Sequence, residues 1–227
     1  MLSTLKRITV ISGHYGSGKT EFAVNFAFWL ADAGKRVSIV DLDIVNPYFC
    51  SREREAQLLQ SGVTLIAQAA ACRSADVPAL PSEVARMFFD NAGSYIVDVG
   101  GDDVGARVLS RYQPEFEKTD YDLWLVVNAN RPQTGTPDQA LNYLHRIEQA
   151  SRLKVSGIVN NTHLCGQTTL DEVRRGNALS VRLCQMTGLP LVCNVIPRAV
   201  LQKDSVTEGL EGALFPIDIW MKKPWEA

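Results

Sequence analysis

The sequence predicts an α/β fold: a doubly wound, mainly parallel sheet with helices on both faces, forming three layers. Short runs rich in Val and Ile alternate along the 227 residues with longer segments of helical periodicity. Several of these runs, of which 123–127 is the plainest, are apolar on both faces, as is typical of a central parallel strand covered by helices. Because no repeat, low-complexity segment or Gly/Ser linker interrupts the pattern, we expect a single domain over residues 1–227.

The apolar runs give the expected strands. We expect these, in chain order, at residues 8–12, 36–41, 63–66, 95–99, 123–128, 155–160 and 191–195, the third being shorter than the rest. The segment after the first strand is apolar on most of its circumference and ends at Gly34, which predicts a buried helix with a glycine C-cap. Further helices are expected at 82–91, after a proline-containing loop, and at 137–150.

The composition limits the classes of function. The 23 Lys and Arg residues against 25 Asp and Glu residues give a net charge of −2, and nonspecific binding to nucleic acid needs a basic face, so we expect no nucleic-acid partner. The five cysteines are scattered without a CxxC pair, so neither a disulfide framework nor a zinc knuckle is expected. No run approaches the roughly 18 apolar residues that span a bilayer, so we expect no membrane span and a cytoplasmic protein.

The strongest motif is Gly13-His-Tyr-Gly-Ser-Gly-Lys-Thr20, a complete GxxxxGK[ST] pattern between an expected strand and an expected helix. Glycines let successive backbone N–H groups surround phosphate oxygens, and the helix N-terminus adds the positive end of its dipole. Lys19 would reach the β- and γ-phosphates, and the Thr20 hydroxyl would ligate Mg²⁺. The residues expected to contact a nucleotide here are Gly13, His14, Tyr15, Gly16, Ser17, Gly18, Lys19, Thr20 and Glu21.

Two carboxylates follow at the end of the next expected strand. Asp41 and Asp43 are spaced i and i+2, which places both on one side of the chain at the carboxyl edge of the sheet, where the phosphates lie. An acidic pair beside phosphates is repulsive unless Mg²⁺ or an attacking water lies between them. We therefore expect a catalytic or metal-binding role for Asp43 and a supporting one for Asp41, the alternative being an aspartate that caps the next turn.

The run from Ile11 to Pro47 resembles the MinD/ParA branch of P-loop ATPases, the CobQ/CobB/MinD/ParA nucleotide-binding group of the SIMIBI class. The resemblance implies the P-loop NTPase fold and a role for Asp43 in positioning the attacking water. That branch usually carries a second lysine directly after the first glycine of the loop, which reaches the nucleotide of a dimer partner, and this chain has His14 there. Since the usual pKa of histidine is about 6.5, His14 would be a pH-dependent cation, and an ATP-dependent homodimer stays an open alternative.

The segment 94–101 resembles the Walker B strand and switch II of the same branch. Its strand ends in Asp98, and a DxxG spacing leads to Gly101. Asp98 would hold Mg²⁺ through water, and the Gly101 backbone N–H would contact the γ-phosphate only before hydrolysis.

Three arginines, two of them just after this segment, allow two interpretations. Asp102 or Asp103 can cap a helix that presents Arg107 and Arg111 at i and i+4. That pair is either a solvated helix face or a source of an arginine finger in place of the missing lysine, and Arg131, at another strand end, is a rival for that role.

Base recognition is suggested by Gly157-Ile-Val-Asn-Asn-Thr-His163, in which Asn160 stands where the family places an asparagine against the purine. The guanine-specific NKxD pattern is not met, because Asn161 and His163 occupy its Lys and Asp positions, so adenine is expected. The family resemblance also places Pro197 and Arg198 in the loop that closes over the base.

Together these features imply a slow Mg-ATP hydrolase, with Lys19 and Asp43 in catalysis and Thr20, Asp43 and Asp98 at the metal. It would act as a nucleotide-dependent switch on a client protein, in positioning or metallocentre maturation. One alternative is a small-molecule kinase or ATP-dependent ligase of the dethiobiotin synthetase or cobyrinic acid synthase type, with a second-substrate pocket built by 46–86. Another is a nonhydrolytic nucleotide-binding module. The tail 214–225 mixes aromatic residues and lysines, and we expect it to dock on the core rather than lie on a membrane surface.

Overall fold

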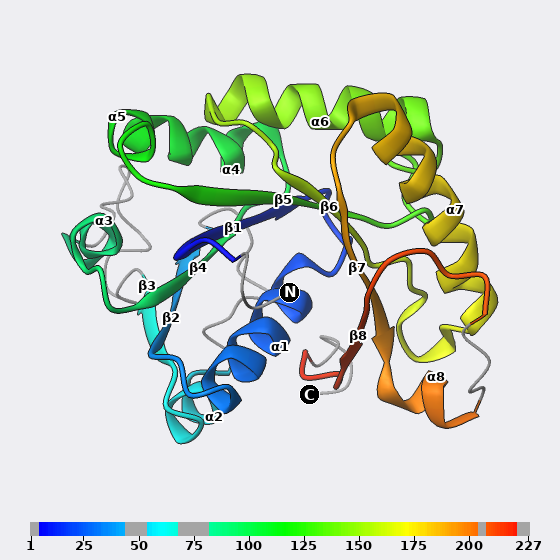
Figure 1. Ribbon diagram of the computed structural model, residues 1–227, viewed down its shortest axis with the longest axis horizontal. Helices are drawn as coiled ribbons and strands as arrows, with labels where there is room; N and C mark the ends of the chain where they lie inside the picture. Colours follow the sequence, from blue (N-terminus) through cyan, green and yellow to red (C-terminus); the bar gives the residue numbers. More distant parts are fainter. Residues whose placement is uncertain (1–4, 44–53, 68–81, 204–207, 222–227) are drawn as a thin grey trace.

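The first strand of the chain lies inside the sheet, with β4 on one side and β5 on the other (Figure 1). The computed structural model describes residues 5–43, 54–67, 82–203 and 208–221. Its sheet has eight strands in the order β3-β2-β4-β1-β5-β6-β7-β8, and every neighbouring pair is parallel. The strands are β1 Ile8–Gly13, β2 Val37–Leu42, β3 Thr64–Ala67, β4 Ser94–Val99, β5 Tyr121–Val127, β6 Gly157–Asn160, β7 Leu191–Pro197 and β8 Leu214–Ile217.

All seven expected strands are confirmed, and the edge strand β8 was not predicted. The α-helices are α1 Lys19–Asp32, α2 Glu55–Gln60, α3 Arg86–Phe89, α4 Asp103–Arg107, α5 Gln113–Phe116, α6 Pro137–Ser151, α7 Leu170–Thr187 and α8 Arg198–Lys203. Short 3₁₀ helices are η4 Ser82–Ala85, η5 Val108–Tyr112 and η6 Cys165–Gln167. The helix expected at 82–91 is therefore η4 followed by α3, and it ends earlier because the backbone turns extended at Asp90.

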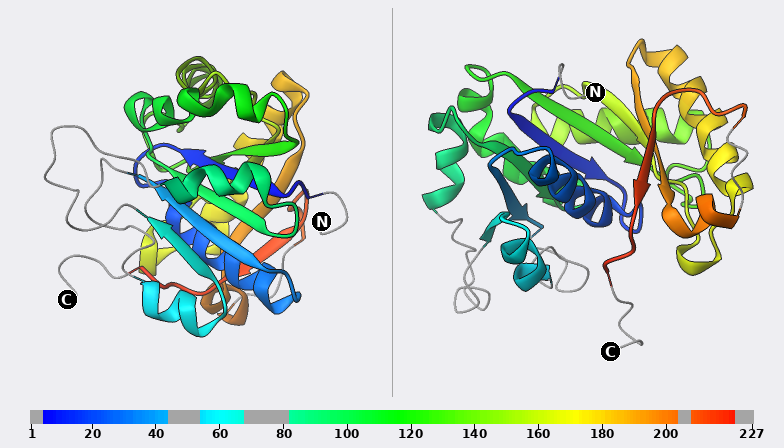
Figure 2. Two further views of the ribbon diagram at one scale, coloured as in Figure 1. Left: turned by 90° about the vertical axis from the view of Figure 1, so that its left-hand side faces the viewer. Right: turned by 60° about the horizontal axis from the view of Figure 1, so that its bottom comes forward.

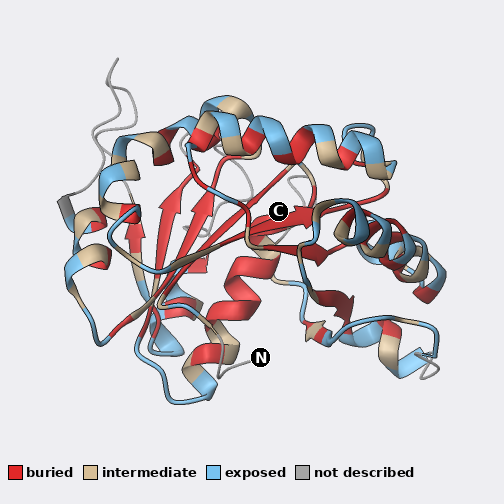
Figure 3. Cartoon of the chain, turned by 45° about the horizontal axis from the view of Figure 1, so that its top comes forward, coloured by how far each residue is buried: buried red, intermediate tan, exposed pale blue. Residues whose placement is uncertain are grey.

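Two hydrophobic clusters pack on opposite faces of the sheet, which confirms the three-layer α/β architecture. The two views of Figure 2 place α1 and α2 on one side and α4, α5 and α6 on the other. On the first side, Phe22 and Phe26 of α1 contact Trp124 of β5 and Phe215 of β8 through their rings. In Figure 3 the strands are almost wholly buried, whereas α6 alternates buried and exposed faces, as its amphipathic sequence requires.

Several helix ends follow the capping chemistry of the sequence. Gly34 adopts a φ of 77° after α1, and its N–H donates to Ala31. The side chain of Asp102 accepts from the Gly105 N–H at 2.6 Å, so the cap of α4 is Asp102 and not Asp103. Because all strands are parallel, the loops after β1, β2, β4, β5, β6 and β7 meet at one edge of the sheet.

The described part of the tail docks on the core, as expected up to residue 221. Strand β8 pairs with β7, and the Glu21 carboxylate accepts the backbone N–H groups of Trp220 and Met221 at 2.7 and 3.0 Å. The Trp220 ring packs edge to face against Phe28 with centroids 5.1 Å apart. Among the residues described, no helix is both long and apolar enough to cross a bilayer.

Candidate functional site

The glycine-rich loop joins β1 to α1 and turns on residues with left-handed backbone. Gly16 has a φ of 72°, and Gly18, the N-cap residue of α1, has a φ of 75°. The Ser17 N–H donates to the His14 carbonyl at 2.9 Å, which closes the turn. A loop of this shape directs backbone N–H groups toward one point above the helix N-terminus, and such a concavity binds anions.

Four ionisable side chains are buried beside the loop. The Lys19 Nζ lies 3.5 Å from Asp43 Oδ2, and the side chains are only 6% and 4% exposed. Asp41 and Asp98 are register partners on the neighbouring strands β2 and β4, and Asp41 Oδ1 accepts the Asp43 N–H at 3.1 Å. Burial raises the pKa of Asp98 from its usual 3.8 to about 7, with Asp41 and Asp43 adding to the rise and Lys19 and Thr20 opposing it. Three carboxylates and one ammonium therefore share a water-poor site.

These residues suit Mg²⁺. Both carboxylate oxygens of Asp98 are buried without a hydrogen-bond partner, and the Thr20 hydroxyl lies beside them. Buried oxygen atoms without partners are costly unless a ligand satisfies them, and oxygen ligands are those that Mg²⁺ prefers. Within the described ranges no group of three or more His, Cys, Asp or Glu side chains is arranged to hold a metal ion unaided. That is the usual situation of Mg²⁺, which takes few protein ligands together with waters and phosphate oxygens.

The backbone of Gly101, the glycine of the DxxG segment, packs directly against the glycine-rich loop. A Cβ at this position would lie 2.7 Å from the Tyr15 backbone N and 2.8 Å from the Gly13 carbonyl oxygen, so a side chain would force the two segments apart. The Gly101 carbonyl accepts a hydrogen bond from the Tyr143 hydroxyl of α6. The loop after β4 is therefore in contact with both the loop after β1 and the helix α6.

His14 is a poor substitute for a lysine. Burial lowers its pKa below the usual 6.5, and the nearby cations Arg131 and Lys19 lower it further against the opposing hydrogen bond to the Tyr15 carbonyl. Its Nδ1 lies 2.8 Å from that carbonyl oxygen, and its ring meets Tyr143 edge to face with centroids 5.5 Å apart. At neutral pH the imidazole is therefore uncharged and held by the protein.

One of the three arginines considered from the sequence touches the loop. The Arg131 Nε donates to the Gly16 carbonyl at 2.9 Å, and the side chain of Asn128 donates to the same oxygen at 3.3 Å. A Cβ on Gly16 would lie 2.7 Å from the Arg131 guanidinium carbon. Arg107 lies instead in a cleft between α4 and α6, and Arg111 is exposed on η5.

Asn160, expected to read the purine, is fully buried. Its Nδ2 donates to the Val173 carbonyl at 3.0 Å and to Asn194 Oδ1 at 2.8 Å. Its Oδ1 accepts the N–H and the hydroxyl of Thr162 at 3.2 and 2.8 Å. All four hydrogen-bonding positions of the amide are thus used inside the protein, so a contact with a base would require some of these bonds to break.

Asn161 and His163, which follow it in the chain, face the glycine-rich loop. Asn161 Nδ2 donates to the carbonyls of Ser17 and Gly18 at 2.9 and 3.2 Å. His163 Nδ1 accepts the Cys165 N–H at 3.2 Å, which leaves the proton of the neutral ring on Nε2. That Nε2 is buried without a partner, 2.9 Å from where a Cβ of Gly18 would stand. Burial, assisted by Arg131, lowers the pKa of His163 to about 4, so the ring is a neutral hydrogen-bond donor at pH 7.

Residues 8–210 match the family described as the CobQ/CobB/MinD/ParA nucleotide binding domain. The chain belongs to this family. No curated protein sequence matches it.

Solved structures with a similar fold include FtsY proteins and a signal recognition particle protein. FtsY from Mycoplasma mycoides matches with a TM-score of 0.54 at 15% identity, covering 83% of this chain and 58% of its own. Chloroplast FtsY from Physcomitrella patens matches with a TM-score of 0.56 at 15% identity, and the match covers 81% of this chain and 56% of the FtsY chain. Signal recognition particle 54 kDa protein from Aeropyrum pernix K1, in complex with GDP, matches with a TM-score of 0.54 at 20% identity. This match covers 81% of this chain and 40% of the other protein. This chain therefore spans about half of each, and identities this low show a shared fold only.

In this member of the CobQ/CobB/MinD/ParA family, two of the side chains expected to contact the nucleotide bind other parts of the protein. Glu21 binds the backbone of the C-terminal segment, and burial raises its pKa. Arg198 Nε lies 3.2 Å from Asp218 Oδ2 on the surface, while Pro197 is buried at the end of β7. The Tyr15 side chain is 58% exposed.

Two residues near the loop were not predicted to act there. Tyr143 lies on a helix more than 120 residues after the loop, and only the packing of α6 brings it to Gly101 and His14. The signal for His163 was present, since it occupies the position of the NKxD aspartate. The segment 46–86, in which a second-substrate pocket was expected, is only partly described, because residues 44–53 and 68–81 lie outside the described ranges.

Proposed function

We propose that this chain binds Mg-ATP at the glycine-rich loop, hydrolyses it slowly and uses the γ-phosphate as a switch that acts on a client protein. The observation that carries the proposal is the buried Lys19–Asp43 pair beside an Asp98 carboxylate whose oxygens have no partner. A buried charged cluster costs stability unless a ligand completes it. A triphosphate with its Mg²⁺ would add anionic oxygens beside Lys19 and a divalent cation beside the carboxylates.

The roles follow from the positions. Backbone N–H groups of the loop and the Lys19 ammonium hold the phosphates, while Thr20, Asp43 and Asp98 hold the metal, Asp98 through water. Bound Mg²⁺ would neutralise the negative charge that develops on the phosphate oxygens. Asp43 orients the attacking water. Gly101, which packs against the loop, offers its N–H to the γ-phosphate and loses that contact after hydrolysis, so the loop after β4 reports the nucleotide state.

Arg131 supplies the cation that His14 does not. Its Nε donates to the Gly16 carbonyl, and its Nη2, which carries further N–H groups, lies 2.7 Å from where a Cβ of Gly16 would stand. An arginine placed within the chain makes a lysine from a second copy unnecessary, as in enzymes whose arginine finger acts in cis. We therefore propose turnover in the monomer, and an ATP-induced homodimer is the competing outcome.

Adenine rather than guanine is supported by His163. A guanine-specific site presents a carboxylate that accepts the N–H groups of the base, whereas His163 offers a buried Nε2–H donor, which suits an acceptor nitrogen of adenine. The Aeropyrum pernix protein was solved with GDP, so GTP is the nucleotide to test against. In the His163→Asp variant we expect the ratio of GTP to ATP turnover to rise, because a carboxylate replaces the donor.

The test is hydrolysis of ATP and of GTP by the purified chain with Mg²⁺, together with its mass in solution with a nonhydrolysable ATP analogue. Lys19→Ala should lose binding, and Asp43→Ala should bind but not turn over. Exposed Lys118→Ala and Asp120→Ala are the matched controls and should behave as wild type. Wild-type turnover in Asp43→Ala would remove that residue from the mechanism. ATP consumption that requires an added metabolite would favour a kinase or ligase over a switch.

A further inference from the structure

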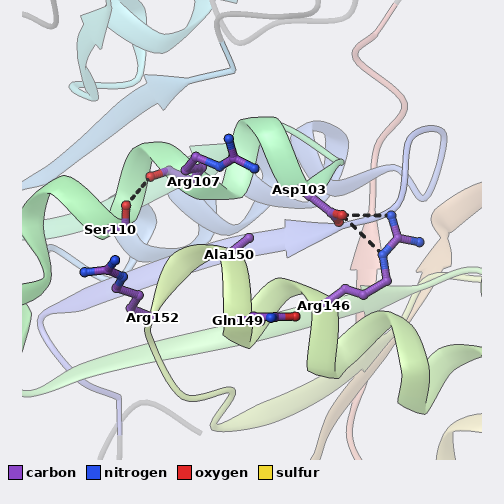
Figure 4. A pocket seen from close by; sticks show the side chains of 7 residues that line it. All are labelled: Asp103, Arg107, Ser110, Arg146, Gln149, Ala150 and Arg152. Carbon is purple, nitrogen blue, oxygen red and sulfur yellow. Dashed lines mark hydrogen bonds and ion pairs between the residues drawn. The ribbon is translucent and has the colours of Figure 1, made fainter.

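A second polar site lies away from the phosphate loop, in a cleft of about 400 Å³ between α4–η5 and α6 (Figure 4). Asp103 and Arg146 meet at one end of the cleft, and Ser110 and Arg152 lie at the other. Arg107 of α4 and Gln149 of α6 complete the polar lining. No role described above uses these side chains.

The cleft carries an excess of positive charge. Asp103 neutralises Arg146, whose Nη2 lies 3.0 Å from Asp103 Oδ2. Among the described residues, neither the Arg107 nor the Arg152 guanidinium has an ion-pair partner, so two positive charges line one small space without a counter-charge. Guanidinium groups bind phosphate and carboxylate in bidentate fashion, and a concave site with several of them is suited to an anion.

Arg152 stands at a position that favours glycine. It has a φ of 60° and ends α6 with its N–H donating to the Glu148 carbonyl at 2.8 Å. A non-glycine residue in this conformation is uncommon and strained, and such residues concentrate at functional sites. The arginine side chain thus occupies the mouth of the cleft at a backbone cost that glycine would avoid.

The cleft is connected to the phosphate loop by direct contacts. Asp103 comes two residues after Gly101, and its partner Arg146 lies over the Tyr143 ring, 5.7 Å from the centroid. The Tyr143 hydroxyl donates to the Gly101 carbonyl, and its ring contacts His14. An anion bound in the cleft therefore lies beside Asp103 and Arg146, and Arg146 contacts Tyr143, whose hydroxyl holds the loop after β4 at Gly101.

We propose that this arginine cleft binds a small polyanion, a molecule with two or more phosphate or carboxylate groups, and that the bound anion changes the rate of nucleotide turnover. The volume suits a metabolite rather than a polymer, since small-molecule sites begin at about 300 Å³. One anionic group pairs with Arg107, and another pairs with Arg152. The effect on turnover rests on the proposed function, whereas the binding itself does not.

The first experiment measures binding by calorimetry in Mg²⁺-free buffer, with fructose 1,6-bisphosphate as the phosphate probe and citrate as the carboxylate probe. Arg107→Gln and Arg152→Gln should each weaken binding about tenfold to a hundredfold, the loss of one charge-assisted contact. Arg182→Gln, on α7 outside the cleft, is the matched control and should bind as wild type, as should Lys19→Ala, which disables the phosphate loop.

The outcomes separate the alternatives. Binding of either probe that only the cleft variants weaken supports the site and identifies the anionic group preferred. No heat with either probe at millimolar concentration would overturn it, as would an equal loss in Lys19→Ala, which would assign the anion to the phosphate loop. Binding of a decaglutamate peptide without binding of either small probe would replace the metabolite by an acidic protein segment and so refute the proposal.

The second experiment measures ATP and GTP turnover with and without the tighter probe. Turnover should change in wild type and in Arg182→Gln but not in Arg107→Gln or Arg152→Gln. Unchanged turnover despite saturated binding would overturn the coupling. Absence of turnover under every condition would refute the proposed hydrolase, while the calorimetric result would still decide whether the cleft binds anions.

Discussion

Replacing Asp98 by Asn should stabilise the protein without ligands and at the same time impair its response to Mg-nucleotide. Asp98 is fully buried, and its pKa rises to about 7 from 3.8. A carboxyl group whose pKa is higher in the folded state binds its proton more tightly there. Its contribution to stability is therefore present at low pH and is lost as the pH rises through about 7.

The magnitude follows from the shift. About three pKa units at roughly 1.36 kcal/mol each give a cost of about 4 kcal/mol when the carboxylate is charged. Asparagine removes that cost but leaves an amide N–H without a partner, which costs about 1–3 kcal/mol. At pH 7.5 the variant should thus be more stable by about 1–3 kcal/mol. Between pH 5 and 7.5 the difference in free energy of unfolding between Asp98→Asn and wild type should grow by about 2–3 kcal/mol, because only wild type has a buried carboxyl group that ionises in this range.

Urea unfolding in EDTA at pH 5, 6 and 7.5, analysed by linear extrapolation, measures this difference. Titratable groups that do not interact with Asp98 titrate alike in both proteins and cancel in the comparison. Added Mg-ATP should raise the unfolding midpoint of wild type more than that of Asp98→Asn, since ligand binding stabilises in proportion to affinity. A stability difference that is flat with pH, or largest at pH 5, would refute the reasoning about the buried carboxylate.

Three further predictions concern the core, the switch glycine and acid stability. Phe26→Ala, in the fully buried ring cluster, should lower the free energy of unfolding by about 3–5 kcal/mol. The exposed Phe89→Ala should change it by less than about 0.5 kcal/mol. Equal losses of stability in urea unfolding would contradict this prediction. Gly101→Ala should reduce turnover at least about tenfold, because its Cβ would lie 2.7 Å from the backbone of the glycine-rich loop. A tenfold loss corresponds to a rise of about 1.4 kcal/mol in the activation free energy. A wild-type rate would show that the contact is dispensable. Because folding lowers the pKa of His163 from 6.5 to about 4, the free energy of unfolding should fall by up to about 3 kcal/mol as the pH drops from 6.5 through 4. His163→Asn should remove this pH dependence, and exposed His145→Asn should keep it. The same pH dependence in wild type and both variants would contradict the prediction.

The sequence predicted most of the sheet because its strands are long apolar runs bounded by glycine or charged residues. Strand β8 was missed because the short segment Leu214–Ile217 contains a proline, which argues against a strand. Proline is tolerated there because β8 is an edge strand that pairs on one side with β7. No local pattern signals such a strand.

Site residues that belong to a local sequence motif could be predicted from the sequence. Residues whose orientation depends on packing against distant segments could be predicted less well. The glycine-rich loop, Asp43 and Asp98 come together because parallel strands end at one edge. Asn160 ends β6 and His163 follows three residues later, yet the amide of Asn160 is hydrogen-bonded to Val173 of α7 and Asn194 of β7. Long-range packing therefore decided which side chain faces the loop, and the arginine cleft, built from two separate helices, had no signature at all.

The central claim is that Lys19 and the carboxylates beside it form a site for a Mg-nucleoside triphosphate. Calorimetric titration of ATP with Mg²⁺ into wild type and Lys19→Ala, each verified as folded by its circular dichroism, tests it most directly. We predict binding of Mg-ATP by wild type, tighter than that of Mg-GTP, and its loss in Lys19→Ala. Absence of binding of both nucleotides to folded wild-type protein, or equal affinity in Lys19→Ala, would contradict the account.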